Sequence, residues 1–445
     1  MLDAREIAYN ITRRVNAEGG YLSLILQYGM DRSGLDSRDR ALVAELVYGV
    51  QRHRNRLDYI IKSFSRRPLD EIEPEVLDLL RLGVYQISEM RVPAHASVNE
   101  AVSLADKRLH RGAASFVNAV LRAAAVGLES LRWPSRDDFP SYLETVYSHP
   151  RWMVENILGC MDKGEAEALC AADNDFRGLT LRMNPSRADR EMLMAEIAKC
   201  GGRARASPYL AEALVKVNLP REQLLGFLEK GYCVVQDESS MVVGYVVHPV
   251  PGSTIVDACA APGGKATHLA QLGGDTCRVI AVDKNPGRLE ALRKAVGRLG
   301  VRNVDIRAGD AARLLEYVAG PVDAILLDAP CSGLGTLRRN PELKWRRLPE
   351  DIAPLAELQL ALLDGCAGVV RPGGVLVYSV CTFTREETVE VMEGFLNLHR
   401  GFRLEDPSPY LPPALRESVE PGGYIQLMPH SHSMEGMFIA RLVRA

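Results

Sequence analysis

The fold of this chain is decided by one stretch of sequence, Thr254-Ile-Val-Asp-Ala-Cys-Ala-Ala-Pro-Gly-Gly-Lys265. It begins as a short apolar strand and runs into a turn with two adjacent glycines, Gly263 and Gly264, before a helical pattern starts. Because glycine has no β-carbon, a glycine turn lets the backbone approach a ligand closely. The stretch therefore predicts a ligand-binding turn between a strand and a helix.

Two common phosphate-binding turns do not fit this stretch. A P-loop needs glycine six positions before its lysine and serine or threonine after it, but Cys259 and Ala266 stand there. A dinucleotide-binding turn needs the pattern G-x-G-x-x-G, which the stretch lacks. The remaining interpretation is a nucleoside ligand that carries no phosphate.

Apolar segments that alternate with helical patterns surround the turn. The strands are predicted at residues 254–258, 278–283, 304–307, 322–328 and 374–379, and the main helices at 288–299 and 349–370. Nearly continuous apolar strands between helices are typical of a doubly wound, mostly parallel α/β sheet of the Rossmann type. Since such sheets bind ligands beyond the carboxyl ends of their strands, we expect the functional residues there.

Three aspartates stand at successive strand ends. Asp283 lies about twenty residues past the turn, where a carboxylate accepts hydrogen bonds from ribose hydroxyls. Asp310 ends the third strand, where it suits an adenine amino group, and Asp328 ends the fourth strand, facing the reacting end of the ligand. Each aspartate alone is equally typical of a helix N-cap. The ordered set after a glycine turn predicts S-adenosylmethionine as the cofactor.

Two cysteines also stand at neighbouring strand ends. Cys331 follows Asp328 in the sequence Asp-Ala-Pro-Cys, and Cys381 follows the fifth strand in the sequence Tyr-Ser-Val-Cys. A single cysteine at such a place is usually a buried core thiol, but two beside a methyl donor indicate covalent chemistry on cytosine. A thiolate that adds to C6 makes C5 nucleophilic, and a second thiol can help to release the product. The residues alone leave open which thiol attacks.

The part of the chain before residue 141 has a different character. Apolar residues recur there at helical spacing, which predicts an all-α domain over residues 1–140. Its clearest helices are predicted at 40–50, 74–85 and 97–105. A stretch with proline and aromatic residues, 133–140, is predicted to be a linker.

Residues 141–230 mix both kinds of secondary structure. A strand is predicted at 179–183 and a helix at 189–198, so this part is predicted to be a small α+β domain. It carries no recognisable chemical motif. The predicted domains of the chain are therefore 1–140, 141–230 and 231–445.

The composition excludes several classes of protein. Of 445 residues, 47% are hydrophobic and 25% are charged, with a net charge of -3, which excludes a mostly disordered chain. No apolar run reaches the ~18 residues of a membrane-spanning helix. The charged start, Met1 to Glu6, does not resemble a secretory signal. We therefore expect a cytoplasmic protein without a membrane partner.

The nine cysteines include no C-x-x-C pair. A structural zinc site needs clustered cysteine and histidine residues, so we expect no metal. Disulfides are rare in chains that are not secreted, so the thiols are expected to be reduced.

Three basic runs stand out from the near-neutral total charge. They span residues 52–67, 107–122 and 338–347. A single run is more often a solvated face than a binding site, but three runs in a chain of negative net charge predict a polyanion partner. Arg52, Arg54 and Arg56 are the first candidates for phosphate contacts.

These motifs resemble those of a known family. Asp257 to Lys265, Leu327 to Gly335 and Tyr378 to Cys381 resemble the motifs of RNA cytosine-C5 methyltransferases. The segments Val98 to Ala105 and Phe116 to Arg122 resemble a NusB-like RNA-binding domain. Nearly the whole chain is then similar to the bacterial enzymes that methylate a cytosine of 16S rRNA, and the likeness is most specific over 231–445.

The resemblance implies a function and a partner. The chain would transfer a methyl group from S-adenosylmethionine to C5 of a cytosine in 16S rRNA through a covalent bond between cysteine and C6. The rRNA would be free or part of an incompletely assembled small subunit. Two alternatives stay open, namely the same chemistry on tRNA or another RNA, and a non-catalytic RNA-binding or ribosome-assembly factor.

The resemblance also implies roles for single residues. Cys381 would be the nucleophile and Cys331 the residue needed for product release, whereas DNA cytosine methyltransferases attack with the Pro-Cys thiol. The implied cofactor contacts are Cys259, Ala260, Ala261, Pro262, Gly263, Gly264, Lys265, Asp283, Asp310 and Asp328.

The match to the family's motifs is incomplete at a few positions. Val380 stands where threonine is usual, and Glu387-Thr388 stands where Glu-Asn is common. Glu435-Gly-Met-Phe438 replaces the usual Asp-Gly-Phe-Phe. These changes are conservative and leave the predicted activity standing, but they leave the roles of Thr388 and Glu435 open. Trp345 is expected to fill core rather than stack on a base, since tryptophan is usually buried.

Overall fold

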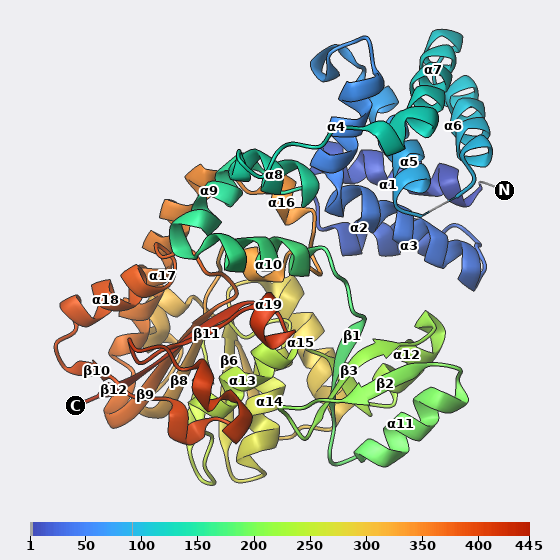
Figure 1. Ribbon diagram of the computed structural model, residues 1–445. Helices are drawn as coiled ribbons and strands as arrows, with labels where there is room; N and C mark the ends of the chain where they lie inside the picture. The colour runs from blue at the N-terminus through green and yellow to red at the C-terminus, as the bar shows by residue number, and fades with distance from the viewer. Residues whose placement is uncertain (1–2, 91) are drawn as a thin grey trace. The chain divides into compact units, whose positions relative to one another are not determined.

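The computed structural model describes residues 3–90 and 92–445 and divides into two compact units (Figure 1). Unit 1 contains the chain up to Asp175 together with Leu337–Arg347. Unit 2 contains Phe176–Thr336 and Leu348–Ala445. A short segment after the Cys331 loop therefore packs with residues from far earlier in the chain. The domain boundaries predicted near residues 140 and 230 remain predictions.

Unit 1 is built from helices, as predicted. The first seven are α1 (Ala4–Glu18), α2 (Leu22–Asp31), α3 (Ser37–Arg52), α4 (Arg54–Phe64), α5 (Pro74–Ser88), α6 (Ala94–Arg108) and α7 (Arg111–Gly127). Helix α5 is central because it packs against α1, α3, α4, α6 and α7. Every residue from Leu79 to Gln86 is buried, as expected for a helix with neighbours all round. Proline at the first position of α5 suits a helix start, where an N–H group has no partner.

Three more helices and one short segment complete unit 1. The helices are α8 (Phe139–Val146), α9 (Arg151–Cys160) and α10 (Lys163–Asp173). The segment 337–347 contains the single-turn helix α16 (Leu343–Arg346). Residues 131–138, which include most of the predicted linker, form no helix or strand.

Unit 2 begins with a small antiparallel sheet. Its strands are β1 (Leu179–Met183), β2 (Arg203–Ala206), β3 (Ala213–Asn218) and β4 (Cys233–Val235), in the order β2-β3-β1-β4. Helices α11 (Arg190–Lys199) and α12 (Arg221–Glu229) accompany it. Their buried side chains, which include Leu193 and Phe227, share one core with Leu181 and Leu214 of the sheet. The strand predicted at 179–183 is confirmed, and the predicted helix begins one residue later, after its Asp189 cap.

The large sheet of unit 2 is mostly parallel. Its strands follow the order β10-β12-β9-β8-β5-β6-β7, with β11 paired to β12. They are β5 (Thr254–Asp257), β6 (Arg278–Asp283), β7 (Val304–Ala308), β8 (Val322–Asp328), β9 (Val370–Val380), β10 (Phe402–Leu404), β11 (Ile425–Leu427) and β12 (Met437–Arg444). Strands β5 to β9 pair in parallel, whereas β12 runs antiparallel to β9.

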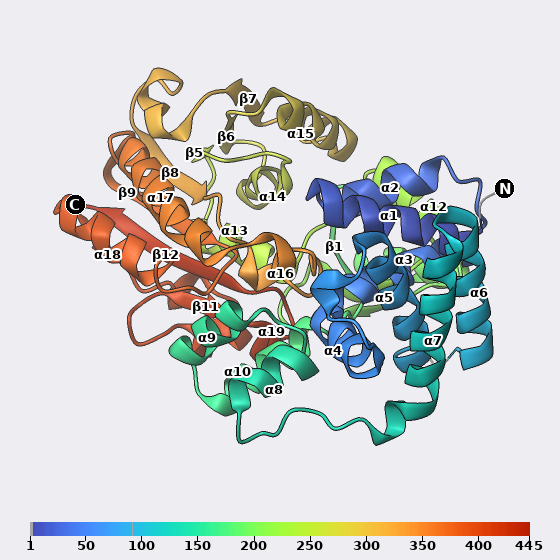
Figure 2. The same cartoon turned by 90° about the horizontal axis from the view of Figure 1, so that it is seen from above.

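Helices cover both faces of this sheet (Figure 2). Ala324 and Leu326 of β8 pack in one core with α13 (Glu238–Val247), α14 (Gly264–Gly273) and α15 (Pro286–Leu299). Their neighbours Ile325 and Leu327 pack in the other core, with α17 (Ile352–Ala367) and α18 (Val389–Leu398). Side chains alternate between the faces of a strand, so a strand buried on both faces is apolar throughout. The predicted doubly wound fold is confirmed.

Among the described residues, no helix combines the length and apolar character that a membrane crossing needs.

Candidate active site

The glycine turn lies where the sequence predicts it, between β5 and α14. Gly263 has φ +110°, in the left-handed region that disfavours other residues. A β-carbon there would also collide with the Leu292 side chain of α15. The preceding Ala261–Pro262 peptide bond is cis. Both backbone conformation and packing therefore require glycine at position 263.

Asp283 joins the end of β6 to this turn. Its carboxylate is buried and accepts hydrogen bonds from the Ala261 amide at 3.1 Å and the Asn285 amide at 2.8 Å. A carboxylate has about four acceptor positions, so two donors leave capacity for ribose hydroxyls. The predicted cofactor contact is compatible with this geometry.

Asp310 and Asp328 have different partners. Asp310 accepts a hydrogen bond from the Ala312 amide at 3.0 Å, which is the helix-cap role that was the alternative for each aspartate. Asp328 accepts from Lys265 Nζ at 2.8 Å and from Ser379 Oγ at 2.9 Å. Asp328 thus connects the turn to β9. The cofactor contacts of both aspartates remain predictions.

Asp257, the last residue of β5, is a site residue that the sequence analysis missed. It is fully buried, and within the described residues neither oxygen accepts a well-formed hydrogen bond. Burial raises the pKa of its carboxyl to about 8, and the nearby Asp328 carboxylate adds to the rise. Lys265 and the Cys259 amide act in the opposite direction. The signal was present in the sequence, since Asp257 ends its strand as Asp283 and Asp328 do.

These residues fit S-adenosylmethionine. The Asp283 carboxylate can accept further hydrogen bonds from a ribose, and Gly263 lets the ligand approach the backbone closely. The buried Asp257 carboxyl can accept a hydrogen bond from the ligand. The ligand carries a cationic amino group, which would favour the ionised form of this carboxyl. Within the described residues, no group of three or more His, Cys, Asp or Glu side chains is arranged to hold a metal ion.

The two predicted thiols lie in contact. The Sγ atoms of Cys331 and Cys381 are 3.3 Å apart. Strands β8 and β9 pair in parallel with Asp328 opposite Ser379, and each cysteine comes just after its strand ends. The shared register of two parallel strands therefore produces the pair that the sequence analysis expected.

The two thiols have different electrostatic surroundings. The pKa of Cys331 is raised well above its ordinary value, first by the hydrogen bond with Cys381 and then by burial. The carboxylates of Glu387 and Asp328 raise it further. Burial lowers the pKa of the Lys265 ammonium group, but the Asp328 carboxylate has the larger effect, so the pKa is raised. Negative charge on Cys381 adds to this rise. The cation therefore interacts with Cys381, while the carboxylates disfavour a thiolate at Cys331.

Glu387 anchors the loops that carry the thiols. Its buried carboxylate accepts hydrogen bonds from the Ser332 amide at 2.8 Å and Gln359 Nε2 at 3.0 Å on one oxygen. The other oxygen accepts from Thr384 Oγ1 at 3.1 Å. Ser332 follows Cys331 and Thr384 follows Cys381 closely, so one carboxylate holds both loops. From the sequence, no role was predicted for Glu387, which stood out only as the neighbour of the unusual Thr388.

Thr388 and the two loop hydroxyls strengthen the same arrangement. Thr388 Oγ1 donates to the Thr384 carbonyl at 2.6 Å. The Oγ of Ser332 and the Oγ1 of Thr382 are 2.9 Å apart. Thr388, whose role was left open, therefore closes the loop after Cys381.

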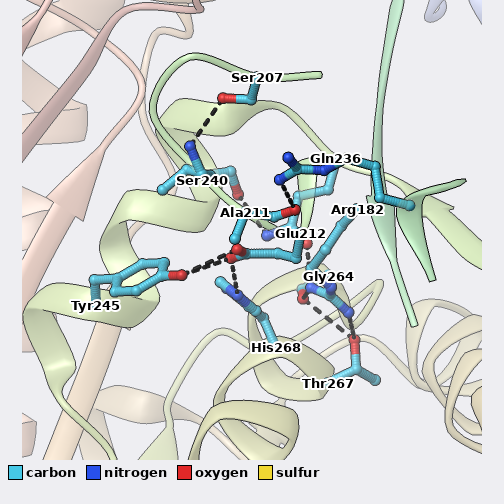
Figure 3. Close-up of polar contacts among 12 residues, drawn as sticks. Arg182, Ser207, Ala211, Glu212, Gln236, Ser240, Tyr245, Gly264, Thr267 and His268 are labelled. Carbon is cyan, nitrogen blue, oxygen red and sulfur yellow. Dashed lines mark hydrogen bonds and ion pairs between the residues drawn. The ribbon is translucent and has the colours of Figure 1, made fainter. Parts of the chain in front are cut away.

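Arg182 of β1 supports the glycine turn from the small sheet (Figure 3). The guanidinium is fully buried and donates to the Gly264 carbonyl at 2.7 Å, to Thr267 Oγ1 at 2.9 Å and to Gln236 Oε1. Burial lowers the pKa of Arg182 to about 9. Gly264 and Thr267 form the first turn of α14, which follows the predicted cofactor loop. No sequence motif predicted a role for Arg182.

Glu212 organises the neighbouring side of α14 (Figure 3). Its carboxylate accepts from the Tyr245 hydroxyl at 3.0 Å and lies 3.2 Å from His268 Nε2. Burial lowers the pKa of His268 to about 4, so the ring is neutral near pH 7. Helices α13 and α14 are thus joined to the small sheet by polar contacts.

Several residues of the basic runs, which predict a polyanion partner, make contacts within the protein. Arg52 is buried and donates to the Arg338 carbonyl at 3.2 Å. Arg54 lies over the Trp345 ring, and Arg56 pairs with Glu89 at 2.9 Å. Arg52 therefore faces the interior of unit 1, whereas Arg54 and Arg56 keep part of their surface exposed, and phosphate contacts of this run remain predictions.

The second and third runs show the same behaviour in part. Lys344 is fully buried and donates to Asn174 Oδ1 at 2.8 Å. Lys107 forms an ion pair with Glu6 at 2.8 Å. Trp345 Nε1 donates to the Gln51 carbonyl at 2.6 Å, but the side chain is only half-buried, so its expected role in the core remains a prediction. A basic run in the sequence shows where charged residues cluster. It does not show which of their side chains a distant segment will bury.

Fold and site together are those of an S-adenosylmethionine-dependent methyltransferase. Three families match parts of the chain. The family described as 16S rRNA methyltransferase RsmB/F matches residues 244–443, the NusB family matches 2–126, and the RsmF/B-like ferredoxin-like domain matches 149–218.

Known proteins resemble the chain over its whole length. A Synechocystis protein named "Probable ribosomal RNA small subunit methyltransferase B" is 37% identical over 100% of both chains. The protein of the same name from Bacillus subtilis is 36% identical over 98% of each chain. The chain therefore belongs to the RsmB/F family of 16S rRNA methyltransferases.

Two solved structures share the fold. The crystal structure of PH0851 has a TM-score of 0.81 at 26% identity and covers 99% of each chain. The structure of NSun6 from Pyrococcus horikoshii with SFG has a TM-score of 0.59 at 26% identity, and covers 67% of this chain and 99% of that one.

Proposed function

We propose that the chain methylates C5 of a cytosine in 16S rRNA, with Cys381 as nucleophile and Cys331 as the residue that releases the product. The observation that carries this proposal is the 3.3 Å contact between the two thiols beside the Lys265–Asp328 ion pair. The rRNA substrate is that of relatives named ribosomal RNA small subunit methyltransferase B. In this proposal residues 1–140 form the NusB-like RNA-binding domain and 231–445 the catalytic domain.

Cytosine needs covalent activation because C5 is a weak nucleophile. The Cys381 thiolate adds its electron pair to C6, the C5–C6 double bond opens, and C5 gains enamine character. S-adenosylmethionine supplies an electrophilic methyl group for C5. Asp328 holds the Lys265 ammonium group in place by a hydrogen bond of 2.8 Å.

Cys331 then removes the C5 proton. In the free protein Cys331 stays protonated, since the hydrogen bond with Cys381 and two carboxylates raise its pKa. Once Cys381 is bound to C6, it no longer carries the negative charge that disfavours a second thiolate. Cys331 can then release its proton to water, and the resulting thiolate accepts the C5 proton; the C5–H electron pair re-forms the C5–C6 double bond, and Cys381 leaves C6 as a thiolate. Contact between the thiols thus supports a sequential use of both.

The target cytosine must leave its stack to be attacked. Addition to C6 requires access to the face of the base, which a paired and stacked cytosine does not offer. Extrusion costs least where pairing is weak, so the proposed substrate is an unpaired or loosely paired cytosine.

The position of the methyl group tests the proposal. A 16S rRNA transcript would be incubated with S-adenosylmethionine and with the wild-type protein or Cys381→Ala, and then sequenced after bisulfite treatment. We expect one cytosine to resist conversion with the wild type and none with the variant. A methyl group on an exocyclic amine or a ribose would contradict the proposed chemistry, and methylation of tRNA but not rRNA would contradict the proposed substrate.

A further inference from the structure

Unit 1 exposes aromatic side chains that the proposed chemistry does not use. Tyr21, Leu24 and Tyr28, at the start of and along α2, have 54%, 64% and 49% of their surfaces exposed. Residues three and four positions apart lie on the same side of a helix. The opposite side packs into the core through Leu22 and Ile25. Apolar side chains grouped on one exposed helix face mark an interaction surface.

Each of the two rings has arginine beside it. The guanidinium of Arg32 lies 4.2 Å from the centre of the Tyr28 ring, and that of Arg14 lies 5.2 Å from it. Arg346 lies 5.0 Å from the centre of the Tyr21 ring. Arg14 also pairs with Glu18, which holds it near Tyr28. The surface therefore combines two exposed rings with the guanidinium groups of Arg14 and Arg32 and with that of Arg346, which is half-buried.

Two distant segments of the chain build this surface. Arg346 belongs to the segment 337–347, which continues the chain from the Cys331 loop. In the same segment, Glu342 is buried and accepts a hydrogen bond from the Leu22 amide at 3.2 Å. A carboxylate at a helix N-terminus is favoured by the helix dipole, so Glu342 fixes the start of α2. The aromatic face is thus held by a segment that is covalently continuous with the catalytic loop.

We propose that this surface, formed by Tyr21, Leu24, Tyr28, Arg14, Arg32 and Arg346, docks unpaired nucleotides of the RNA substrate. The proposal rests on the proposed function. Tyrosine rings and guanidinium planes stack on unpaired bases, and guanidinium groups bind phosphates with two hydrogen bonds. Tyrosine and arginine also serve protein interfaces, but cations at every ring of the surface favour a polyanion.

The surface is an alternative to the site that the basic run 52–67 predicts. Arg52 is buried and donates to the Arg338 carbonyl, while Arg54 and Arg56 are half-buried, with the Trp345 ring and Glu89 as partners. In the same run, Lys62, Arg66 and Arg67 remain exposed, and the ring that Arg67 lies over, Phe116, is half-buried rather than exposed. They provide a control surface of matched charge.

Binding of a fluorescent 16S rRNA transcript tests the proposal. All proteins would carry Cys381→Ala, so that no covalent adduct contributes. We expect Tyr21→Ala with Tyr28→Ala to weaken binding about tenfold or more, as loss of base stacking does, and Tyr21→Phe with Tyr28→Phe to bind normally. Arg14→Gln with Arg32→Gln should reduce the salt dependence of binding, by about 0.7 in log–log slope for each lost phosphate contact in single strands.

Three controls separate the possible outcomes. Val126→Ala removes another exposed apolar side chain of unit 1, 88% accessible, and should not change RNA binding. Melting temperature and S-adenosylmethionine affinity should stay unchanged in all these variants, because the side chains are exposed. Lys62→Gln, Arg66→Gln and Arg67→Gln together should weaken binding less than the tyrosine pair.

Several results would overturn the proposal. One is unchanged affinity of the tyrosine pair, and another is a larger loss in the lysine and arginine control. Normal binding to the transcript combined with lost binding to partly assembled small subunits would assign the surface to a protein partner instead. Failure of the wild-type protein to bind or methylate rRNA at all would overturn the proposed function, which is a distinct result.

Discussion

The Sγ atoms of Cys331 and Cys381 lie 3.3 Å apart, although 50 positions separate the two residues in the chain. Parallel pairing of β8 with β9 brings both strand ends to one edge of the sheet. Around the pair, Lys265 interacts with Cys381, while Glu387 and Asp328 raise the pKa of Cys331. Two identical side chains therefore differ in chemistry because their surroundings differ.

Single substitutions should separate the two thiols. Cys381→Ala is expected to abolish methylation and every covalent RNA adduct, because no thiolate remains to add to C6. Cys331→Ala is expected to stop the reaction after methyl transfer and to accumulate protein bound to methylated RNA. A denaturing gel would show this adduct as a slow band that requires S-adenosylmethionine.

The double variant provides the control for this prediction. It should behave like Cys381→Ala alone, because both residues act in one pathway and their effects are not additive. The reverse pattern, with an adduct in Cys381→Ala and none in Cys331→Ala, would assign the nucleophile to Cys331. No adduct in either variant would leave Cys331 as a structural residue.

Glu387 should matter for the rate of the reaction rather than for cofactor binding. Glu387→Ala leaves the Ser332 amide, Gln359 and Thr384 without their acceptor, and each unpaired buried group costs about 1–3 kcal/mol. We expect a drop in kcat of at least about tenfold, with S-adenosylmethionine affinity near that of the wild type. Steady-state kinetics and calorimetric titration measure the two quantities.

Two milder variants keep this test interpretable if Glu387→Ala unfolds. Glu387→Gln retains one carbonyl oxygen and should show a smaller loss of kcat. Thr388→Ala removes a single hydrogen bond to the Thr384 carbonyl and should lose less still. Equal kcat in all three proteins would mean that the position of the thiol loops does not limit the reaction.

Arg182 lies in the small sheet, but its loss should weaken the binding of the cofactor. Arg182→Met removes the donors to the Gly264 carbonyl and Thr267 at the start of α14. We expect the dissociation constant for S-adenosylmethionine to rise about tenfold, which is the effect of roughly 1.4 kcal/mol. Arg205→Met, an exposed arginine in the same small sheet, is the matched control. A lower melting temperature with unchanged cofactor affinity would show that Arg182 only stabilises the fold.

Asp257 should make the stability of the cofactor-free protein depend on pH. Its pKa is about 8 in the folded protein and about 3.9 in an unfolded chain. Between these values the folded protein holds a proton that the unfolded chain has released. The contribution of Asp257 to stability is therefore fully present below about pH 3.9 and is lost as the pH rises toward 8, on the order of 1.4 kcal/mol for each pKa unit.

Asp257→Asn should remove this dependence, since asparagine does not titrate. Thermal unfolding between about pH 5 and about pH 8 should show a falling melting temperature in the wild type and a flatter profile in the variant. Asp310→Asn is the control, because Asp310 is a partly exposed helix cap. Parallel profiles in wild type and Asp257→Asn would mean that Asp257 is ionised over this range.

Residue patterns along the chain were enough to predict the doubly wound fold and the place of the site. Strands such as β6 and β8 are buried on both faces, and therefore their sequences are apolar runs. Their observed bounds are the predicted ones, 278–283 and 322–328. Parallel strands end at one edge of a sheet, and therefore Cys331 and Cys381 could be expected to meet before any coordinates were known. Gly263 was predictable for a similar reason, because backbone geometry leaves few alternatives.

Which charged and polar side chains are buried, and which partners they contact, could not be predicted from these patterns. Arg52 and Lys344 lie in runs that look solvated, yet packing of segment 337–347 with the first 175 residues covers them. Arg182 and Glu387 also reach partners far away in the chain, Gly264 and Ser332. Local patterns reflect strand and helix periodicity, whereas the partner of a buried charge depends on chain segments that are distant in sequence and meet only in the folded protein.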